Sequence, residues 1–152
     1  MLRLVLLALV LLPAVKTCAQ IGLPLKRLRV TSAFGNRIHP VTGQPDFHAG
    51  IDLRACHDTV YAVMPGVIDH AGYNPLLGLF IKLSNGPFTL TYGHLSGFFV
   101  ITGDTVNSQS SLGLTGATGR VTGEHLHFAV QYNHRYIDPL TFLAAALKHF
   151  NQ

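Results

Sequence analysis

The sequence has few charged residues, two cysteines and no tryptophan. At 152 residues the chain has room for one ordinary domain, which excludes a multidomain enzyme. No apolar run reaches the roughly 20 residues that a membrane-spanning helix needs. The chain also lacks a His-Glu-x-x-His helix and a glycine-rich phosphate loop followed by lysine, so these two kinds of catalytic site are excluded.

The most hydrophobic stretch lies at the N-terminus and has the organisation of an export signal. Arg3 precedes a twelve-residue apolar run over 4–15, and Thr17-Cys18-Ala19 offers small residues for cleavage. A lipid anchor on Cys18 is the alternative, although Lys16 interrupts the apolar approach to it. We predict a signal peptide over residues 1–19, a short connector over 20–30 and one domain over 31–152.

Cleavage after Ala19 changes the charge and the cysteine content of the mature chain. It leaves 9 of the 11 basic residues against 7 acidic ones, a balance too mild for nucleic-acid binding. Cys56 remains as the only cysteine, so no internal disulfide can form. We expect an exported monomer, periplasmic or extracellular, with no nucleic-acid partner and no membrane association after cleavage.

Beyond residue 30 the sequence consists of short apolar runs separated by Gly, Pro and Asn, which is typical of an antiparallel β protein. Ser84-Asn85-Gly86-Pro87 predicts a hairpin with an Asn-Gly turn. Asp138 as cap and Pro139 at the first position predict one short C-terminal helix that continues over 140–150. The fold class is therefore mostly β, with an antiparallel sheet core and an active-site groove formed by loops. The expected strands are residues 59–64, 67–71, 79–83, 88–92, 98–101, 111–115, 126–131 and 136–137.

Three segments of this β pattern carry residues that can bind a metal or move a proton. His48 and Asp52 are four residues apart, and the glycine between them indicates a bent segment rather than a helix. His125 and His127 alternate with apolar residues, so they share one face of a strand. His94 follows the end of another strand. Each segment alone also fits surface histidines or a turn-capping aspartate, but together they predict a groove that gathers strand ends.

The order and spacing of these segments resemble the lysostaphin-type, or LytM-type, zinc endopeptidases that cleave bacterial peptidoglycan. The resemblance extends over residues 31–143, nearly all of the mature chain. The motifs are jointly far more specific than any one of them. In chain order they are Phe34-Gly35-Asn36-Arg37-Ile38-His39-Pro40-Val41-Thr42-Gly43, His48-Ala49-Gly50-Ile51-Asp52, Tyr92-Gly93-His94-Leu95-Ser96, Gly113-Leu114-Thr115-Gly116-Ala117-Thr118-Gly119 and His125-Leu126-His127-Phe128.

The resemblance implies one zinc ion per chain and a role for each of five residues. His48, Asp52 and His127 would be the zinc ligands, and His94 and His125 would be the catalytic imidazoles beside the metal. Three protein ligands leave a fourth position for a water molecule, whose pKa zinc lowers to about 7. The implied activity is that of a secreted zinc endopeptidase, in which this water attacks peptide bonds in the stem peptides or cross-bridges of peptidoglycan.

Three further residues are candidates for substrate binding. Asn36 and Arg37 belong to the motif before the first ligand, which runs along the groove wall in members of the family. Tyr92 lies two residues before His94 and is expected on the same face, where it would aid the oxyanion. A structural salt link for Arg37 and a packed aromatic ring for Tyr92 are the competing interpretations.

The segment after Asp52 departs from the family pattern. Cys56 and His57 lie where members of the family usually have a Gly-Thr turn, and we expect the Cys56 thiol to be packed in the interior. Two other functions remain open. A catalytically silent member would bind peptidoglycan or a partner enzyme as a regulatory module. A zinc-stabilised structural domain would instead close its metal site with Cys56 or His57 as the fourth ligand.

Overall fold

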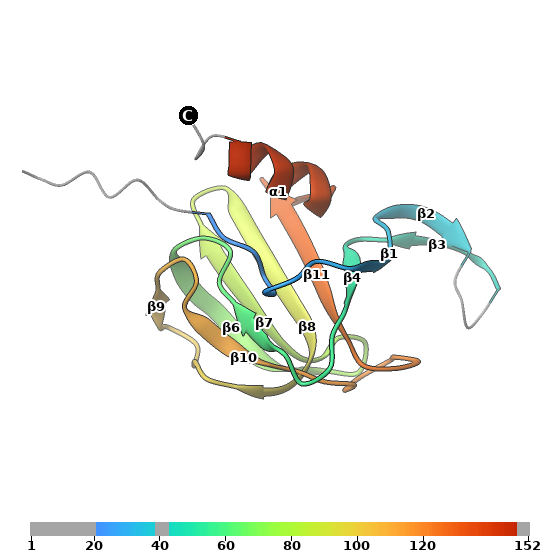
Figure 1. Ribbon diagram of the computed structural model, residues 1–152, viewed down its shortest axis with the longest axis horizontal. Helices are drawn as coiled ribbons and strands as arrows, with labels where there is room; N and C mark the ends of the chain where they lie inside the picture. Colours follow the sequence, from blue (N-terminus) through green and yellow to red (C-terminus); the bar gives the residue numbers. More distant parts are fainter. Residues whose placement is uncertain (1–20, 39–42, 149–152) are drawn as a thin grey trace, which may run out of the picture.

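Figure 1 shows the computed structural model of the protein, which describes residues 21–38 and 43–148. The signal peptide predicted over residues 1–19 lies outside these ranges. No helix within them is long and apolar enough to cross a membrane.

The described residues form twelve strands and one C-terminal helix, which confirms the predicted mostly β fold class. Ten of the strands form one antiparallel sheet, and β2 and β3 form a second, two-stranded sheet. The elements are β1 (Val30–Ser32), β2 (Gly35–Ile38), β3 (Pro45–His48), β4 (Ile51–Arg54), β5 (Thr59–Tyr61), β6 (Gly66–Asn74), β7 (Gly78–Asn85), β8 (Phe88–Phe98), β9 (Thr105–Val106), β10 (Ser111–Thr115), β11 (His125–Tyr132), β12 (Arg135–Ile137) and α1 (Pro139–Lys148).

The main sheet places β11 and β8 at its centre. Its strand order is β1-β4-β11-β8-β7-β6-β9, with β10 paired to β5 and β8, and β12 paired to β11. In Figure 1 the β2–β3 hairpin projects beside β4, and α1 lies over one end of the sheet next to β11. Segments that are far apart in the sequence therefore meet on the surface formed by β4, β11 and β8.

One face of this sheet is buried in a hydrophobic core because polar and apolar residues alternate along its strands. In β11, Leu126 and Phe128 are completely buried, whereas the flanking His125 and His127 lie on the opposite face. The predicted shared face of the two histidines is thus confirmed. Leu25, in the predicted connector, also packs into this core.

Two predicted strands end differently in the structure. The strand predicted over 59–64 stops at Tyr61, because the next residue leaves the ladder and its N–H donates to the Ser110 carbonyl at 2.9 Å. The prediction of a strand over 98–101 is wrong beyond Phe98, where the long strand β8 ends. Phe99 instead donates its N–H to the Leu112 carbonyl at 2.8 Å. In both segments the backbone N–H groups find hydrogen-bond acceptors although the residues are outside a strand. The apolar content of a segment does not show this difference.

The hairpin between β7 and β8 is confirmed, but its turn lies one residue later than expected. Asn85 pairs with Phe88, so Gly86 and Pro87 are the two turn residues. Gly86 has a φ of 54°, which suits the first position of a primed turn, and proline supplies a negative φ at the second.

The C-terminal helix begins as predicted. Asp138 caps it, because its Oδ1 accepts the Leu140 N–H and its Oδ2 accepts the Thr141 hydroxyl, each at 2.9 Å. Phe142 then packs against Phe88, with ring centroids 5.4 Å apart, which holds the helix on the sheet. The predicted continuation to residue 150 lies outside the described residues.

Tyr92 belongs to the core. Its side chain is 0% exposed, it packs on Phe128 with ring centroids 5.4 Å apart, and its hydroxyl accepts the Val63 N–H at 3.1 Å. Burial raises the pKa of this hydroxyl above its ordinary value, so it stays protonated. The structure therefore supports the packed-aromatic interpretation and contradicts a contact between Tyr92 and substrate.

We expect Tyr92→Phe to lower the free energy of unfolding by about 1–3 kcal/mol, because the Val63 N–H would lose its partner inside the core. Tyr132→Phe is the matched control, since that side chain is 45% exposed, and it should change stability by less than about 0.5 kcal/mol. Urea unfolding followed by circular dichroism measures both variants. Equal stability of Tyr92→Phe and the unmodified protein would contradict this role of the hydroxyl.

Candidate functional site

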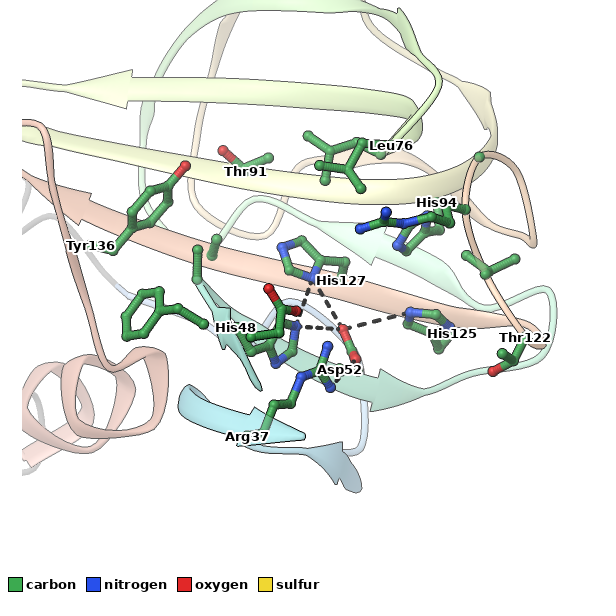
Figure 2. A pocket seen from close by; sticks show the side chains of 18 of the residues that line it. Arg37, His48, Asp52, Leu76, Thr91, His94, Thr122, His125, His127 and Tyr136 are labelled. Carbon is green, nitrogen blue, oxygen red and sulfur yellow. Dashed lines mark hydrogen bonds and ion pairs between the residues drawn. The ribbon is translucent and has the colours of Figure 1, made fainter. Parts of the chain in front are cut away.

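Three candidate metal donors converge on the polar face of the main sheet, two through strand pairing and one through the short connection between β3 and β4 (Figure 2). His48 ends β3, Ala49 and Gly50 form a bend, and Asp52 follows in β4. His127 lies directly opposite Asp52 in the β4–β11 ladder. Asp52 Oδ1 is 3.1 Å from His48 Nε2 and 3.0 Å from His127 Nδ1, and these two nitrogens are 3.2 Å apart.

The chemistry of this donor set fits a zinc ion. Donor atoms about 2.0–2.2 Å from a tetrahedral zinc lie roughly 3.3–3.6 Å from one another, and the observed separations are only slightly shorter. The Nδ1–H of His48 donates to the Ala33 carbonyl at 2.9 Å, which orients the ring so that Nε2 faces Asp52 and His127. Nε2 of His48 is therefore the ring nitrogen that can serve as a ligand beside the Asp52 carboxylate.

The protonation states of Asp52 and His127 are those that bind a metal. Burial alone would raise the pKa of Asp52, but hydrogen bonds and charge interactions with His127 and His48 outweigh it and hold the pKa well below its ordinary value. Burial lowers the pKa of His127, which keeps its imidazole neutral at pH 7. A carboxylate beside neutral imidazole is the form in which these side chains ligate zinc.

His94 reaches the same site through a β-bulge in β8. The β7–β8 ladder shifts register between Tyr92 and Leu95, and His94 within this shift has a left-handed φ of 61°. Tyr92 and Leu95 both enter the core, whereas His94 lines the cavity (Figure 2). The expectation that Tyr92 and His94 share a face is therefore wrong, because the bulge interrupts the alternation of the strand.

His94 and His125 are oriented in the same way. Each Nδ1–H donates to a main-chain carbonyl, that of Thr118 at 2.9 Å from His94 and that of Gly123 at 2.8 Å from His125. Nε2 of each ring takes no part in these bonds, His125 Nε2 lies 3.6 Å from Asp52 Oδ1, and the two ring centroids are 4.7 Å apart. Burial lowers the pKa of His94 to about 4, so this imidazole is neutral and can accept a proton at pH 7.

The five residues of the site lie in one cavity of about 510 Å³. Ala129, Thr91 and Lys82 extend its floor across β11, β8 and β7, and loop residues including Leu76 and Arg120 complete its wall. The cavity is thus formed by strand faces as well as by the predicted loops. Sequence reasoning missed these lining residues, although Lys82 is the one charged residue in the apolar run 79–83.

Among the candidate substrate-binding residues, Arg37 alone lines the cavity. Its Nη1 is 3.7 Å from Asp52 Oδ2 and also donates to the Ser32 hydroxyl, which is the structural salt link considered from the sequence. Asn36 is exposed on β2 and is not one of the lining residues, and Tyr92 is in the core.

Cys56 and His57 lie apart from the cavity. The expectation of a packed Cys56 thiol is wrong, because the short connection between β4 and β5 leaves this residue exposed. Neither residue joins the donor group of His48, Asp52 and His127, and both are grouped instead with Glu124. A structural zinc site closed by Cys56 or His57 therefore does not fit this geometry.

Comparison with known proteins gives the same class of protein that the fold and the metal donors indicate, a metallopeptidase. A family model described as peptidase family M23 matches residues 46–139. The chain belongs to peptidase family M23, and the resemblance to lysostaphin-type enzymes is thereby confirmed.

Similar proteins include a curated relative and two solved structures. Peptidoglycan DD-endopeptidase ShyC of Vibrio cholerae is 38% identical over 121 residues, which are 78% of this chain and 28% of that protein. A zinc-containing peptidase from Vibrio cholerae superposes with a TM-score of 0.73 and 33% identity, covering 79% of this chain and 39% of that one. The lysostaphin catalytic domain from Staphylococcus simulans has a TM-score of 0.70 and 30% identity, with 77% and 92% covered. The chain spans less than a third of the length of the curated relatives that it matches.

Gly50→Ala should weaken zinc binding at least about tenfold, because a Cβ at this position would lie 2.8 Å from His127 Cε1 and 2.6 Å from the Phe128 carbonyl oxygen. Gly123→Ala is the matched control, since its added Cβ would meet no atom within 4 Å. Calorimetric titration of the metal-free proteins with Zn²⁺ measures both affinities. If a folded Gly50→Ala protein bound zinc like the control, the placement of His127 would not depend on this close approach.

Proposed function

We propose that this chain is a zinc-dependent endopeptidase that hydrolyses peptide bonds in peptidoglycan stem peptides or cross-bridges. The observation that carries the proposal is the convergence of His48, Asp52 and His127 beside the two oriented imidazoles of His94 and His125. Membership of family M23 and the DD-endopeptidase name of ShyC support the reaction and the substrate class.

The geometry of the site supports a role for each of the five residues. His48, Asp52 and His127 would hold the zinc ion, which would supply a Lewis acid and lower the pKa of a water molecule to about 7. Nε2 of His94 and of His125 would accept the proton of the attacking water. An imidazole protonated in this way would then donate a hydrogen bond to the developing oxyanion or a proton to the leaving amine.

The positive side chains around the cavity support an acidic peptide as substrate. Lys82 is half-buried in the floor, and among the described residues no carboxylate oxygen lies within 4.0 Å of its ammonium group. Arg120 adds an exposed guanidinium at the wall. Stem peptides of peptidoglycan carry free carboxylates, which these groups would bind.

The proposed substrate and the N-terminal sequence agree on the place of action. Peptidoglycan lies outside the cytoplasmic membrane, and residues 1–19 have the organisation of an export signal. The active protein would then be a periplasmic or extracellular monomer of residues 20–152. A silent regulatory module is the less favoured alternative, because such a module needs no complete set of metal donors and oriented imidazoles.

Substitutions at the site should separate metal binding from catalysis. His127→Ala is expected to lose both the zinc of this site and the activity, because it removes one of three ligands. His94→Ala and His125→Ala should keep the zinc of this site and lose activity roughly 100-fold or more, since each removes only a proton acceptor. Zinc content and mass spectrometry of fragments released from purified peptidoglycan measure the two properties.

His70→Ala is the control for these histidine variants, because His70 stacks on Phe80 outside the cavity lining, and it should retain both zinc and activity. Peptidoglycan left intact by a zinc-loaded, folded protein would favour the binding module. Full activity of His94→Ala and His125→Ala would contradict their roles as proton acceptors.

Lys82→Met should raise KM for peptidoglycan peptides about tenfold or more with a smaller change in kcat, because the variant keeps the aliphatic stem and loses the charge that would bind carboxylate. Lys26→Met is the control, since this lysine is exposed in the connector. Steady-state hydrolysis of peptides that retain or lack the free carboxylates provides the measurement. An unchanged KM for the acidic peptides would remove Lys82 from the binding site.

A further inference from the structure

A second group of metal donors lies outside the cavity, formed by Cys56, His57 and Glu124. One donor atom from each side chain lies within 4.8 Å of the other two. We propose that these three residues form a second zinc site. The site is distinct from the one at His48, Asp52 and His127, and it does not depend on the proposed peptidase activity.

The backbone between β4 and β5 brings two neighbouring side chains to the same point. His57 has a left-handed φ of 51°, an unusual conformation for a residue other than glycine. This turn sets His57 Nδ1 3.3 Å from Glu124 Oε2, and the His57 N–H donates to the other carboxylate oxygen. Adjacent residues of an extended strand would point to opposite sides. The turn therefore allows Cys56 and His57 to bind the same metal ion.

Hydrogen bonds hold both the loop and the carboxylate in place. The Cys56 N–H donates to Asp58 Oδ2 and the Asp58 N–H donates to Thr115 Oγ1, each at 2.9 Å. The Thr115 hydroxyl in turn donates to Glu124 Oε1 at 3.0 Å. The carboxylate is thereby fixed beside the imidazole, so little rearrangement is needed when a metal binds.

The donor types select zinc over harder cations. A thiolate, an imidazole and a carboxylate are common zinc ligands, whereas magnesium and calcium prefer sites built from oxygen alone. Cys56 and His57 are exposed, with the His57 side chain 74% accessible, so an ion can enter from solvent. Three protein ligands would leave one coordination position for water.

Cobalt binding tests the site, because a thiolate ligand gives Co²⁺ an intense near-ultraviolet charge-transfer band that nitrogen and oxygen ligands do not give. The cavity contains no sulfur donor, so this band reports the second site alone. The metal-free, reduced full chain is titrated with Co²⁺, and bound metal is counted after equilibrium dialysis. We expect two ions per chain and the charge-transfer band.

Four variants identify the ligands in this titration. Cys56→Ser should lose the band and one bound ion. His57→Ala and Glu124→Gln should each weaken Co²⁺ binding at this site, followed by the band, at least about tenfold. Cys18→Ser, which changes the other cysteine of the chain, should keep the band. His127→Ala should keep it as well, so a failure of the cavity site is distinguished from a failure of this one.

Three results would overturn the proposal. The first is the absence of a charge-transfer band in the full chain, and the second is a band that survives in Cys56→Ser. The third is an unchanged affinity for Co²⁺, followed by this band, in both His57→Ala and Glu124→Gln. The last result would indicate adventitious binding to the exposed thiol.

Discussion

The hydrogen-bonded register of three neighbouring strands is the constraint on which the site depends. Asp52 of β4 pairs with His127 of β11, and His127 pairs in turn with Gly93 of β8, directly before His94. A shift of β11 by one residue would turn His127 into the core and bring Phe128 to the polar face. The hydrophobic core therefore fixes the metal donors, because the burial of Phe128 and its neighbours selects one register.

The same arrangement concentrates electron-rich atoms in a small volume. His48 Nε2 and the carboxylate of Asp52 face each other at 3.1 Å, and the hydrogen bond from His48 to the Ala33 carbonyl holds the imidazole in this position. Hydrogen bonds and charge interactions with His48 and His127 stabilise the Asp52 carboxylate here, and a zinc ion held by the same three side chains would supply that stabilisation instead. The imidazoles of His94 and His125, each fixed by a main-chain carbonyl, then lie beside the position that a metal would occupy.

Periodic features of the sequence predicted more of this structure than local backbone features did. Alternation placed His125 and His127 on one face, and Asp138 with Pro139 marked the start of the helix. The positive φ of His94 could not be predicted, because the residue type alone does not indicate a left-handed conformation. The bulge at His94 therefore went unrecognised, and His94 and Tyr92 lie on opposite faces rather than on the same one. Lining residues such as Lys82 come from strands that are distant in sequence, and only tertiary structure shows that they share a cavity with the histidines.

Strands β4 and β11, with the connection from β3, prearrange one open zinc site between His48, Asp52 and His127. Anomalous X-ray diffraction at the zinc edge, from crystals grown with one equivalent of zinc, tests it most directly. We expect a principal anomalous peak about 2.0–2.2 Å from His48 Nε2, Asp52 Oδ1 and His127 Nδ1, with no fourth protein ligand. A principal peak elsewhere, or one that His94 or His125 coordinates as a fourth ligand, would contradict it.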